Sequence, residues 1–256
     1  MTRSNGKGES KQSRRDFLLR AGATATGLAL APSILPERLG AVRAQQARLK
    51  IGVIGSGLIG GSVGLRWAQA GHEILFSSRH PEELTELVDR AGPRARAGMP
   101  EEAAAFGEVV FVAVPYAALP QVGRDYGSLM RGKVVIDCGN PYPRRDGPMA
   151  NDALKKGTGV ASAEYLPGVR LVRAFNAISY RSVKEEAHRE GEKVGIPIAG
   201  DDLEALQVAS ALVVDAGFDP VVVGPLARAR EFDQGTPVYV TDMTAYELIQ
   251  ALNLGQ

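Results

Sequence analysis

The chain has 256 residues, of which 45% are hydrophobic, with a formal net charge of +1 and a single cysteine, Cys138. Residues 1–44 carry eight Lys or Arg and three Asp or Glu, which leaves residues 45–256 with a net charge of −4. The acidic balance argues against nucleic-acid binding, and one cysteine excludes an internal disulfide. No stretch after residue 44 is long and apolar enough to embed the mature protein in a membrane.

The first 44 residues have the order of segments that is typical of an export signal. The letters SRRDFL place Arg14 and Arg15 ahead of an apolar run of eleven residues, Ala21–Ala31. That run is too short to span a bilayer, and small residues precede a cleavage site after Ala44. The sequence predicts a twin-arginine signal peptide, a partnership with the twin-arginine export machinery, and a periplasmic or other extracytoplasmic location. The alternative is a disordered tail with a chance arginine pair.

After the signal, short β-branched runs alternate with longer helical patterns. Such alternation predicts an α/β fold with a doubly wound parallel sheet of the Rossmann type. Strands are expected at Leu49–Ile54, Glu73–Phe76, Arg94–Ala97, Val109–Val114, Val134–Asp137, Leu171–Asn176, Gly195–Ala199 and Val221–Val223. Helices are expected at Leu58–Ala70, Pro81–Arg90, Glu101–Ala105, Tyr116–Leu129, Asp202–Asp215 and Thr244–Leu252.

A glycine-rich turn between the first strand and the first helix matches the dinucleotide-binding fingerprint. In this motif the first glycine permits the turn, the second leaves room for the pyrophosphate, and the third lets the helix pack on the strand. The alternative is a glycine-rich corner without a ligand. The expected pyrophosphate-binding residues are Gly55, Ser56, Gly57, Leu58, Ile59 and Gly60.

The end of the second strand indicates which dinucleotide is bound. NAD-binding sites place Asp or Glu there to accept a hydrogen bond from the ribose 2′-hydroxyl. This chain has Ser78 and Arg79 instead, and arginine forms strong hydrogen bonds with phosphate. We therefore expect NADP rather than NAD. The alternative is that Arg79 is an ordinary surface residue.

The order of several segments resembles one known family. GVIGSGLIGG, SSRHPEEL, VFVAVPYAAL, DCGNPY, VRAFNAIS, GDDLEAL and GFDPVVVGPLARAR together look like the NADPH-dependent reductases of the deazaflavin coenzyme F420. The resemblance covers most of residues 50–231. The fingerprint by itself would be shared by many dehydrogenases, including pyrroline-carboxylate reductases and the soluble domain of six-transmembrane ferric reductases, whereas the combined order of segments is more specific. The resemblance implies direct hydride transfer between NADP(H) and a second ligand, which coenzyme F420 would be in this family.

The resemblance also implies which further residues line the cleft. Val114 and Pro115 end the central strand, and Asn140, Ala174 and Asn176 match segments on the nicotinamide side of the family's cleft. We accordingly expect an NADP-binding domain over residues 45–224. A C-terminal segment, residues 225–256, completes the cleft, and its polar sequence departs from the family and leaves the second ligand open. This segment is also compatible with a homodimer.

No catalytic acid, base or metal ligand stands out in the sequence. His72, His80 and His188 are not spaced as metal ligands, and surface or structural roles are favoured for His72 and His80. Cys138 has no obvious histidine partner and is interpreted as a small buried residue. Asp137 is expected to fix the loop after its strand, and the alternative is that it helps to position the substrate.

Three functions are compatible with these features. The first is an exported NADP-dependent oxidoreductase of the F420-reductase type that acts on a small redox substrate. The second is a reductase of a small carbonyl or imine compound with NADP as a retained group. The third is a non-catalytic NADP-binding protein.

Overall fold

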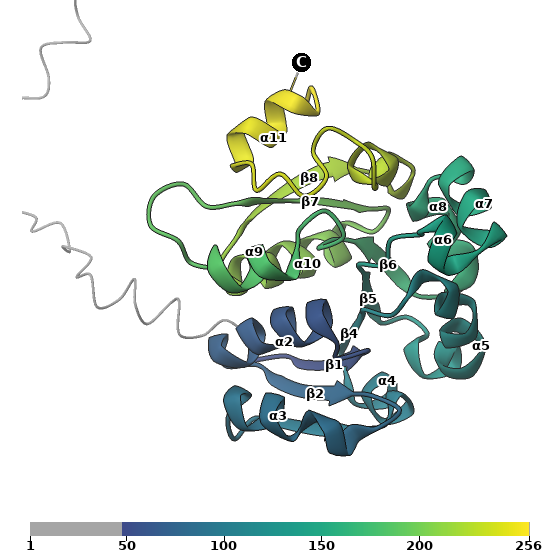
Figure 1. Cartoon of the computed structure of the whole chain (residues 1–256), viewed down its shortest axis with the longest axis vertical. Helices are drawn as coiled ribbons and strands as arrows, with labels where there is room; N and C mark the ends of the chain where they lie inside the picture. The colour runs from purple at the N-terminus through teal and green to yellow at the C-terminus, as the bar shows by residue number, and fades with distance from the viewer. Residues whose placement is uncertain (1–47, 256) are drawn as a thin grey trace, which may run out of the picture. The chain divides into compact units, whose positions relative to one another are not determined.

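A single eight-stranded sheet organises the part of the chain that the structure describes. The structure is a computed structural model, and it describes residues 48–255 (Figure 1). The strand order is β3-β2-β1-β4-β5-β6-β7-β8. The strands are β1 (Lys50–Ile54), β2 (Glu73–Ser77), β3 (Ala95–Gly98), β4 (Val109–Val112), β5 (Val134–Asp137), β6 (Arg170–Arg173), β7 (Gly195–Gly200) and β8 (Asp219–Gly224).

The first six strands run parallel, so the predicted doubly wound α/β fold is confirmed. Strand β7 pairs antiparallel with β6, and β8 pairs parallel with β7. The last two strands therefore point opposite to the other six. The carboxyl ends of β1 to β6 share one edge of the sheet, where open α/β sheets bind ligands.

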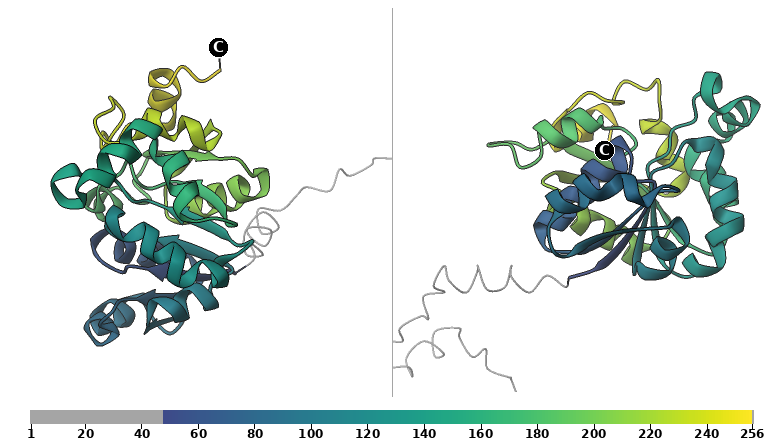
Figure 2. Two further views of the ribbon diagram at one scale, coloured as in Figure 1. Left: turned by 90° about the vertical axis from the view of Figure 1, so that its right-hand side faces the viewer. Right: turned by 60° about the horizontal axis from the view of Figure 1, so that its bottom comes forward.

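Helices cover both faces of the sheet (Figure 2). Successive side chains of a strand point to opposite faces of the sheet, so each strand contributes to two hydrophobic cores. In β4, Val109 and Phe111 belong to the first core, and Val110 and Val112 belong to the second. The first core packs against α2 (Leu58–Ala70), α3 (Thr85–Ala91), α9 (Tyr180–Glu185) and α10 (Leu203–Asp215). The second packs against α4 (Pro100–Phe106), α5 (Leu119–Met130), α7 (Pro148–Lys156) and α8 (Thr158–Tyr165).

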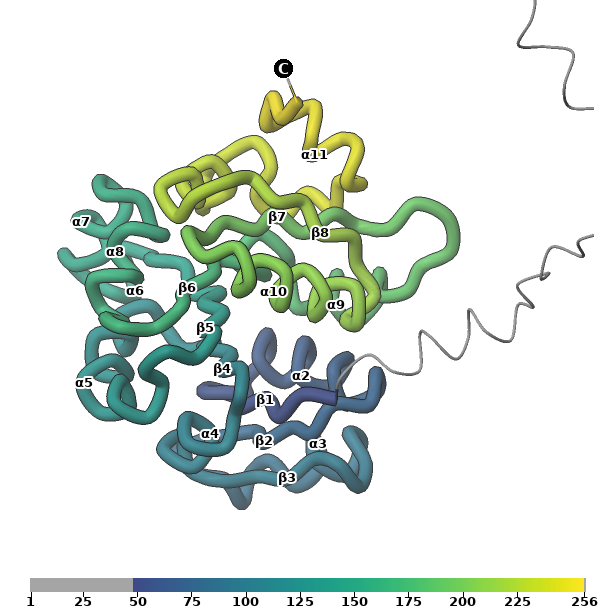
Figure 3. The backbone as a smooth tube through the Cα atoms, turned by 180° about the vertical axis from the view of Figure 1, so that it is seen from behind, coloured from purple at the N-terminus to yellow at the C-terminus, as the bar shows by residue number. Residues whose placement is uncertain are grey.

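The first core also joins the two halves of the sheet. The only tryptophan of the chain, Trp67 on α2, is fully buried and donates a hydrogen bond from Nε1 to the carbonyl oxygen of Leu212 on α10 at 2.7 Å. Its ring packs edge-on against Phe111 and Phe175, with centroids 5.1 and 5.7 Å apart. Figure 3 shows α2 beside α9 and α10.

Several helices differ from the expected ones. The helices expected at 81–90 and 116–129 each begin with a separate 3-10 turn, η1 (Pro81–Leu84) and η2 (Tyr116–Ala118). Three helices between β5 and β6 were not expected, namely α6 (Pro143–Asp146), α7 and α8, and neither was α9. They are short, and Gly147 and Gly157 separate them with φ of 71° and 87°, so no long helical period marks them in the sequence.

The C-terminal residues pack on the last two strands. The segment holds η3 (Leu226–Phe232) and α11 (Ala245–Ala251), which share a third core with β7 and β8. The expected final helix is present, because Thr244 and Glu247 form a capping box at its start. The predicted signal peptide falls outside the described residues. No helix in residues 48–255 has the length and apolar character of a membrane span.

Candidate functional site

The turn between β1 and α2 holds the glycines of the GSGLIG motif in three different environments. Gly55 has a φ of +91°, which side chains rarely adopt. A Cβ atom on Gly60 would lie 2.0 Å from the carbonyl oxygen of Gly55, so only glycine permits this packing. A Cβ atom on Gly57 would meet no atom within 4 Å. Gly57 thus faces open space, where the fingerprint places a pyrophosphate.

The N-terminus of α2 has the features of an anion-binding site. Gly57 is the N-cap and brings no side chain to the first turn, which also lacks acidic residues. The N–H groups of that turn are therefore available, and the helix dipole favours negative charge there. Ser56 fixes the turn to β2, because its hydroxyl accepts a hydrogen bond from the backbone N–H of Ser77 at 2.9 Å.

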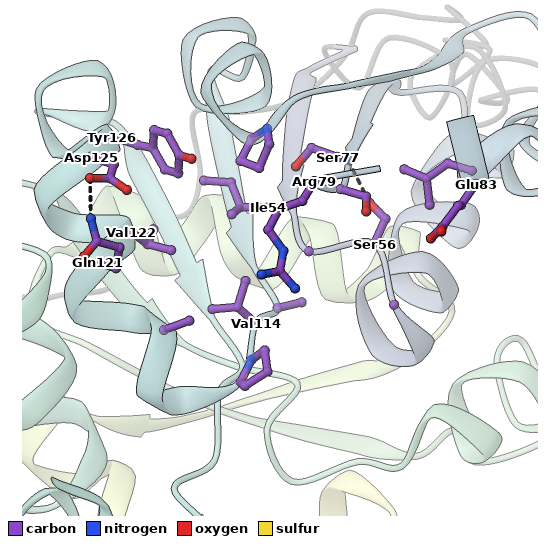
Figure 4. A pocket seen from close by; sticks show the side chains of 18 residues that line it. Ile54, Ser56, Ser77, Arg79, Glu83, Val114, Gln121, Val122, Asp125 and Tyr126 are labelled. Carbon is purple, nitrogen blue, oxygen red and sulfur yellow. Dashed lines mark hydrogen bonds between the residues drawn. The ribbon is translucent and has the colours of Figure 1, made fainter. Parts of the chain in front are cut away.

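A first cavity of about 700 Å³ opens beside this turn (Figure 4). It lies at the carboxyl ends of β1, β2 and β4, with α5 as its far wall. Arg79 is exposed, extends into the cavity, and forms no hydrogen bond or ion pair within residues 48–255. Ser78 lines the cavity beside it. The carboxylates of Glu83 and Asp125 also line this space, and Asp125 accepts a hydrogen bond from Gln121.

A second cavity of about 610 Å³ adjoins the first, and both are lined by Ala113, Val114 and Pro115. Both volumes are within the range of small-molecule sites. The second cavity therefore continues the cleft past the end of β4, away from the Ser78 and Arg79 side. Its lining residues are Leu58, Ile59, Cys138, Gly139, Asn140, Tyr142, Arg145, Phe175, Asn176, Ile178, Ser179, Tyr180, Tyr239 and Val240, besides the three that it shares.

Two residues that line the second cavity each have a buried side-chain oxygen without a hydrogen-bond partner among the described residues. Asn140 Oδ1 and Asn176 Oδ1 are buried and accept no hydrogen bond from any described residue. The amide nitrogens of these side chains are engaged, Asn140 Nδ2 with the carbonyl oxygen of Asn176 at 2.8 Å and Asn176 Nδ2 with that of Phe232 at 3.3 Å. Buried polar atoms are normally satisfied. Asn140 and Asn176 thus each carry an unused acceptor, although neither oxygen is exposed to the cavity that the two residues line.

The structure brings most of the predicted site residues to one cleft. Two of them do not line it. Gly60 is buried below the turn and acts through packing. Ala174 is fully buried in the first core, and the cavity is lined instead by its neighbour Phe175, whose φ is +62°. This left-handed residue turns the chain after β6, which changes the side that each following residue faces.

Among the polar lining residues that were not expected from the sequence, three lie together in the second cavity. Tyr142 and Tyr239 form a hydroxyl–hydroxyl hydrogen bond of 2.6 Å, and the guanidinium of Arg145 lies 4.8 Å from the centre of the Tyr142 ring. Arg145 is the only charged residue that lines the second cavity among the described residues. Tyr142 directly follows the DCGNP segment, which was the one available signal for it. Nothing local in the sequence marks Tyr239.

A buried ionic network supports the wall behind the second cavity. Arg173 is fully buried, and its Nη1 donates to Asp137 Oδ2 at 2.6 Å while its Nη2 lies 3.8 Å from Asp233 Oδ1. Burial alone would lower the pKa of Arg173, but the two carboxylates raise it above its usual value. Asp137 Oδ1 also accepts from the backbone N–H of Gly139 at 2.8 Å, so it fixes the following loop as expected. The network joins β5 and β6 to the C-terminal segment.

The other titratable residues have structural contacts. Burial raises the pKa of the Cys138 thiol, which keeps it protonated. His72 is buried, accepts from the backbone N–H of Leu49, and pairs through Nε2 with Asp215 at 3.0 Å. Within residues 48–255 no group of three or more His, Cys, Asp or Glu is placed to hold a metal ion.

Comparison with known proteins identifies relatives of the chain. Residues 50–141 match the family model described as NADP oxidoreductase, coenzyme F420-dependent. The chain is 30% identical over 207 residues to the F420-dependent NADP reductase of Methanothermobacter thermautotrophicus, which covers 75% of this chain and 88% of that protein. It is 31% identical over 191 residues to metalloreductase STEAP3 of Rattus norvegicus, which covers 72% of this chain but only 36% of that protein.

The fold has a close counterpart among solved structures. A hypothetical protein from Sinorhizobium meliloti superposes with a TM-score of 0.67 at 23% identity, covering 80% of this chain and 98% of that one. At this identity the likeness concerns the fold alone. The chain spans little more than a third of the metalloreductase, so that comparison concerns one part of a longer protein.

Proposed function

Because the chain belongs to the family of F420-dependent NADP reductases, we propose that it is an oxidoreductase that transfers a hydride between NADP(H) and a second ligand. The observation that carries this proposal is the continuous cleft, with an open pyrophosphate cradle at Gly57 and a second cavity beyond Pro115. When bound, NADPH supplies the hydride, and the protein's task is to hold two ligands in contact.

The residues of the cleft fit the parts of NADP. The turn at Gly57 and the N–H groups of α2 bind the pyrophosphate, and Arg79 with Ser78 binds the 2′-phosphate. Asn140 and Asn176 line the second cavity, where the nicotinamide would lie. The second ligand then occupies the rest of the second cavity, and we propose coenzyme F420 for it.

The proposal is tested by mixing the purified protein with NADPH and oxidised coenzyme F420. Loss of the deazaflavin absorbance, with one NADP formed per F420 reduced, is the expected result. Binding of NADPH without any reduction of F420 would contradict the assignment of F420. Reduction of a carbonyl or imine compound under those conditions would favour the second candidate function instead.

Arg79 decides between NADP and NAD in this proposal. Replacing it by aspartate places a carboxylate beside the 2′-phosphate, so we expect NADP affinity to fall at least about tenfold. A charge-assisted hydrogen bond contributes on the order of 1.5 kcal/mol or more, which corresponds to that change. NAD affinity should hold or rise, because the new carboxylate can accept from a free 2′-hydroxyl. Titration calorimetry with both nucleotides measures the effect.

The control for this variant is Arg94→Asp. Arg94 is also exposed and carries the same charge, but it does not line the cleft. Its replacement should leave the affinities for both nucleotides unchanged. Equal NADP affinity in Arg79→Asp and wild type would show that the 2′-phosphate is bound elsewhere.

We propose further that the protein is exported in folded form through the twin-arginine machinery and carries NADP with it. The support is the SRRDFL segment, the apolar run and the cleavage site after Ala44. A ligand at about 100 times its dissociation constant adds roughly 2.7 kcal/mol to the folded state, and this gain is available where NADP is abundant. Cofactor binding therefore precedes export in this scheme.

Changing Arg14 and Arg15 to lysine should stop the precursor in the cytoplasm. The retained protein is expected to be folded, to contain NADP and to begin at Met1, whereas processed wild type should begin at Gln45. Native mass spectrometry with N-terminal sequencing of both proteins makes the comparison. An exported protein that lacks nucleotide and cannot hold added NADP would contradict the retained-cofactor scheme.

A further inference from the structure

We propose that the hydroxyl pair of Tyr142 and Tyr239 donates a proton to the second ligand when that ligand accepts the hydride. The inference rests on the proposed hydride transfer and deepens it. It assigns the second ligand to the class of acceptors with a ring or chain nitrogen or a carbonyl oxygen that is protonated on reduction. Deazaflavins, carbonyl compounds and imines share this property.

The geometry leaves one hydroxyl proton for a ligand. The oxygens of Tyr142 and Tyr239 are 2.6 Å apart, so one O–H donates to the other oxygen. Asn140 Nδ2 lies 3.4 Å from the Tyr239 hydroxyl and can only donate to it. The second hydroxyl proton is therefore not used within the pair. Both residues line the second cavity, which places this proton where the second ligand binds.

The backbone just after Tyr239 adopts an unfavourable, left-handed conformation. Val240 has a φ of +55°, a value that is a genuine outlier for a β-branched residue. Its backbone N–H donates to the carbonyl oxygen of Ala177 at 2.9 Å, and nearby Asp242, with a φ of +52°, accepts from Ser182 Oγ at 2.7 Å. Strained residues of this kind are concentrated at functional sites. Val240 directly follows Tyr239, so the hydrogen bond to Ala177 holds the chain beside the tyrosine pair.

Burial and the contact with Tyr142 keep the Tyr239 hydroxyl protonated, and Arg145 orients the Tyr142 ring. Burial and the hydrogen bond with Tyr142 raise the pKa of Tyr239, and Asp233 raises it further, while Arg145 acts in the opposite direction. The Arg145 guanidinium is fixed by Asp146 at 2.8 Å and lies over the Tyr142 ring. The Tyr239 hydroxyl therefore stays protonated at neutral pH.

The proton step balances the hydride transfer. The acceptor carbon gains a C–H bond, and its electron pair moves to the nitrogen or oxygen of the ligand. The O–H bond of the cavity-facing tyrosine breaks, and its proton goes to that atom. The tyrosine oxygen then takes the proton of its partner, which recovers one from solvent. General acids of this kind typically accelerate a reaction 10²- to 10⁴-fold.

The test compares wild type with Tyr142→Phe, Tyr239→Phe and the double variant, using NADPH and coenzyme F420. The double variant is expected to lose about 100-fold in kcat, and its rate should rise as the pH falls, because the proton must then come from solvent. The single variant whose loss equals that of the double identifies the donor. Affinity for NADPH should stay unchanged throughout. Tyr246→Phe, on the exposed side of α11, is the control that should match wild type.

The outcomes separate this inference from the proposed function. Wild-type rates and an unchanged pH profile in the double variant would overturn the role of the pair. If wild type binds F420 without reducing it, the proposed function fails, and the pair is judged by F420 affinity from deazaflavin fluorescence. A tenfold weaker affinity in the double variant then supports the hydroxyl contact, and equal affinity overturns it. Wild type that neither binds nor reduces F420, and that reduces no carbonyl or imine compound with NADPH, would overturn both.

Discussion

Replacing Gly57 by valine is expected to abolish nucleotide binding while the protein stays folded. A side chain at this position enters open space, and the φ of Gly57 is −74°, outside the left-handed region that favours glycine. The added methyl groups would occupy the place of the pyrophosphate. We expect NADP affinity to fall at least about 100-fold, which corresponds to about 2.8 kcal/mol. Titration calorimetry measures the affinity, and thermal unfolding checks the fold.

A matched control is available on α5, at a position away from both cavities. A Cβ atom on Gly127 of α5 would also meet nothing within 4 Å, and Gly127 lines neither cavity. Gly127→Val should therefore bind NADP like wild type. Wild-type affinity in Gly57→Val would mean that the nucleotide does not lie on this turn.

Replacing Arg173 by methionine should have the largest effect on stability. The guanidinium is fully buried between Asp137 and Asp233, and its removal leaves two buried carboxylates without their cation. Breaking a buried pair in this way costs about 3–5 kcal/mol. Urea unfolding followed by the fluorescence of Trp67, the only tryptophan, measures the change in the free energy of unfolding.

A control variant must show that the loss of stability comes from the buried position of Arg173 and not merely from the loss of a positive charge. Arg170 forms a comparable bidentate pair with Asp202, but at the surface. Arg170→Met should therefore have a much smaller effect, because water solvates the remaining carboxylate. Adding Asp137→Asn to Arg173→Met should restore part of the stability. Equal losses in the Arg173 and Arg170 variants would contradict the importance of burial.

Local patterns predicted the nucleotide half of the fold well. The period of apolar residues marks β1, α2 and β4. The glycines at 55, 57 and 60 form a short motif whose turn and helix start lie within a few residues, so the sequence alone identifies it. Strand direction has no such local signature, so nothing near β7 indicates that it reverses. The helices between Pro143 and Tyr165 were missed for a related reason, since each is too short to show a period.

The residues that line the second cavity could be predicted only in part. Asn140 and Asn176 were found through their motifs, but the position of Ala174 depends on the left-handed conformation of Phe175, which an aromatic residue rarely adopts. Tyr239 reaches the cleft through the strained turn at Val240, held by a distant carbonyl. Contacts of this kind follow from tertiary packing and leave no pattern in the neighbouring sequence.

The distance in sequence between the cavity's walls has a consequence for the order in which the molecule is assembled. Tyr239 meets Tyr142 across 97 residues and Asn140 across 99. N-terminal segments are synthesised first, and contacts that close long loops form late. The strands and the turn around Gly57 can therefore assemble on a nascent chain before its last segment exists. An incomplete chain at that stage has the glycine turn but lacks Tyr239, and with it one wall of the second cavity.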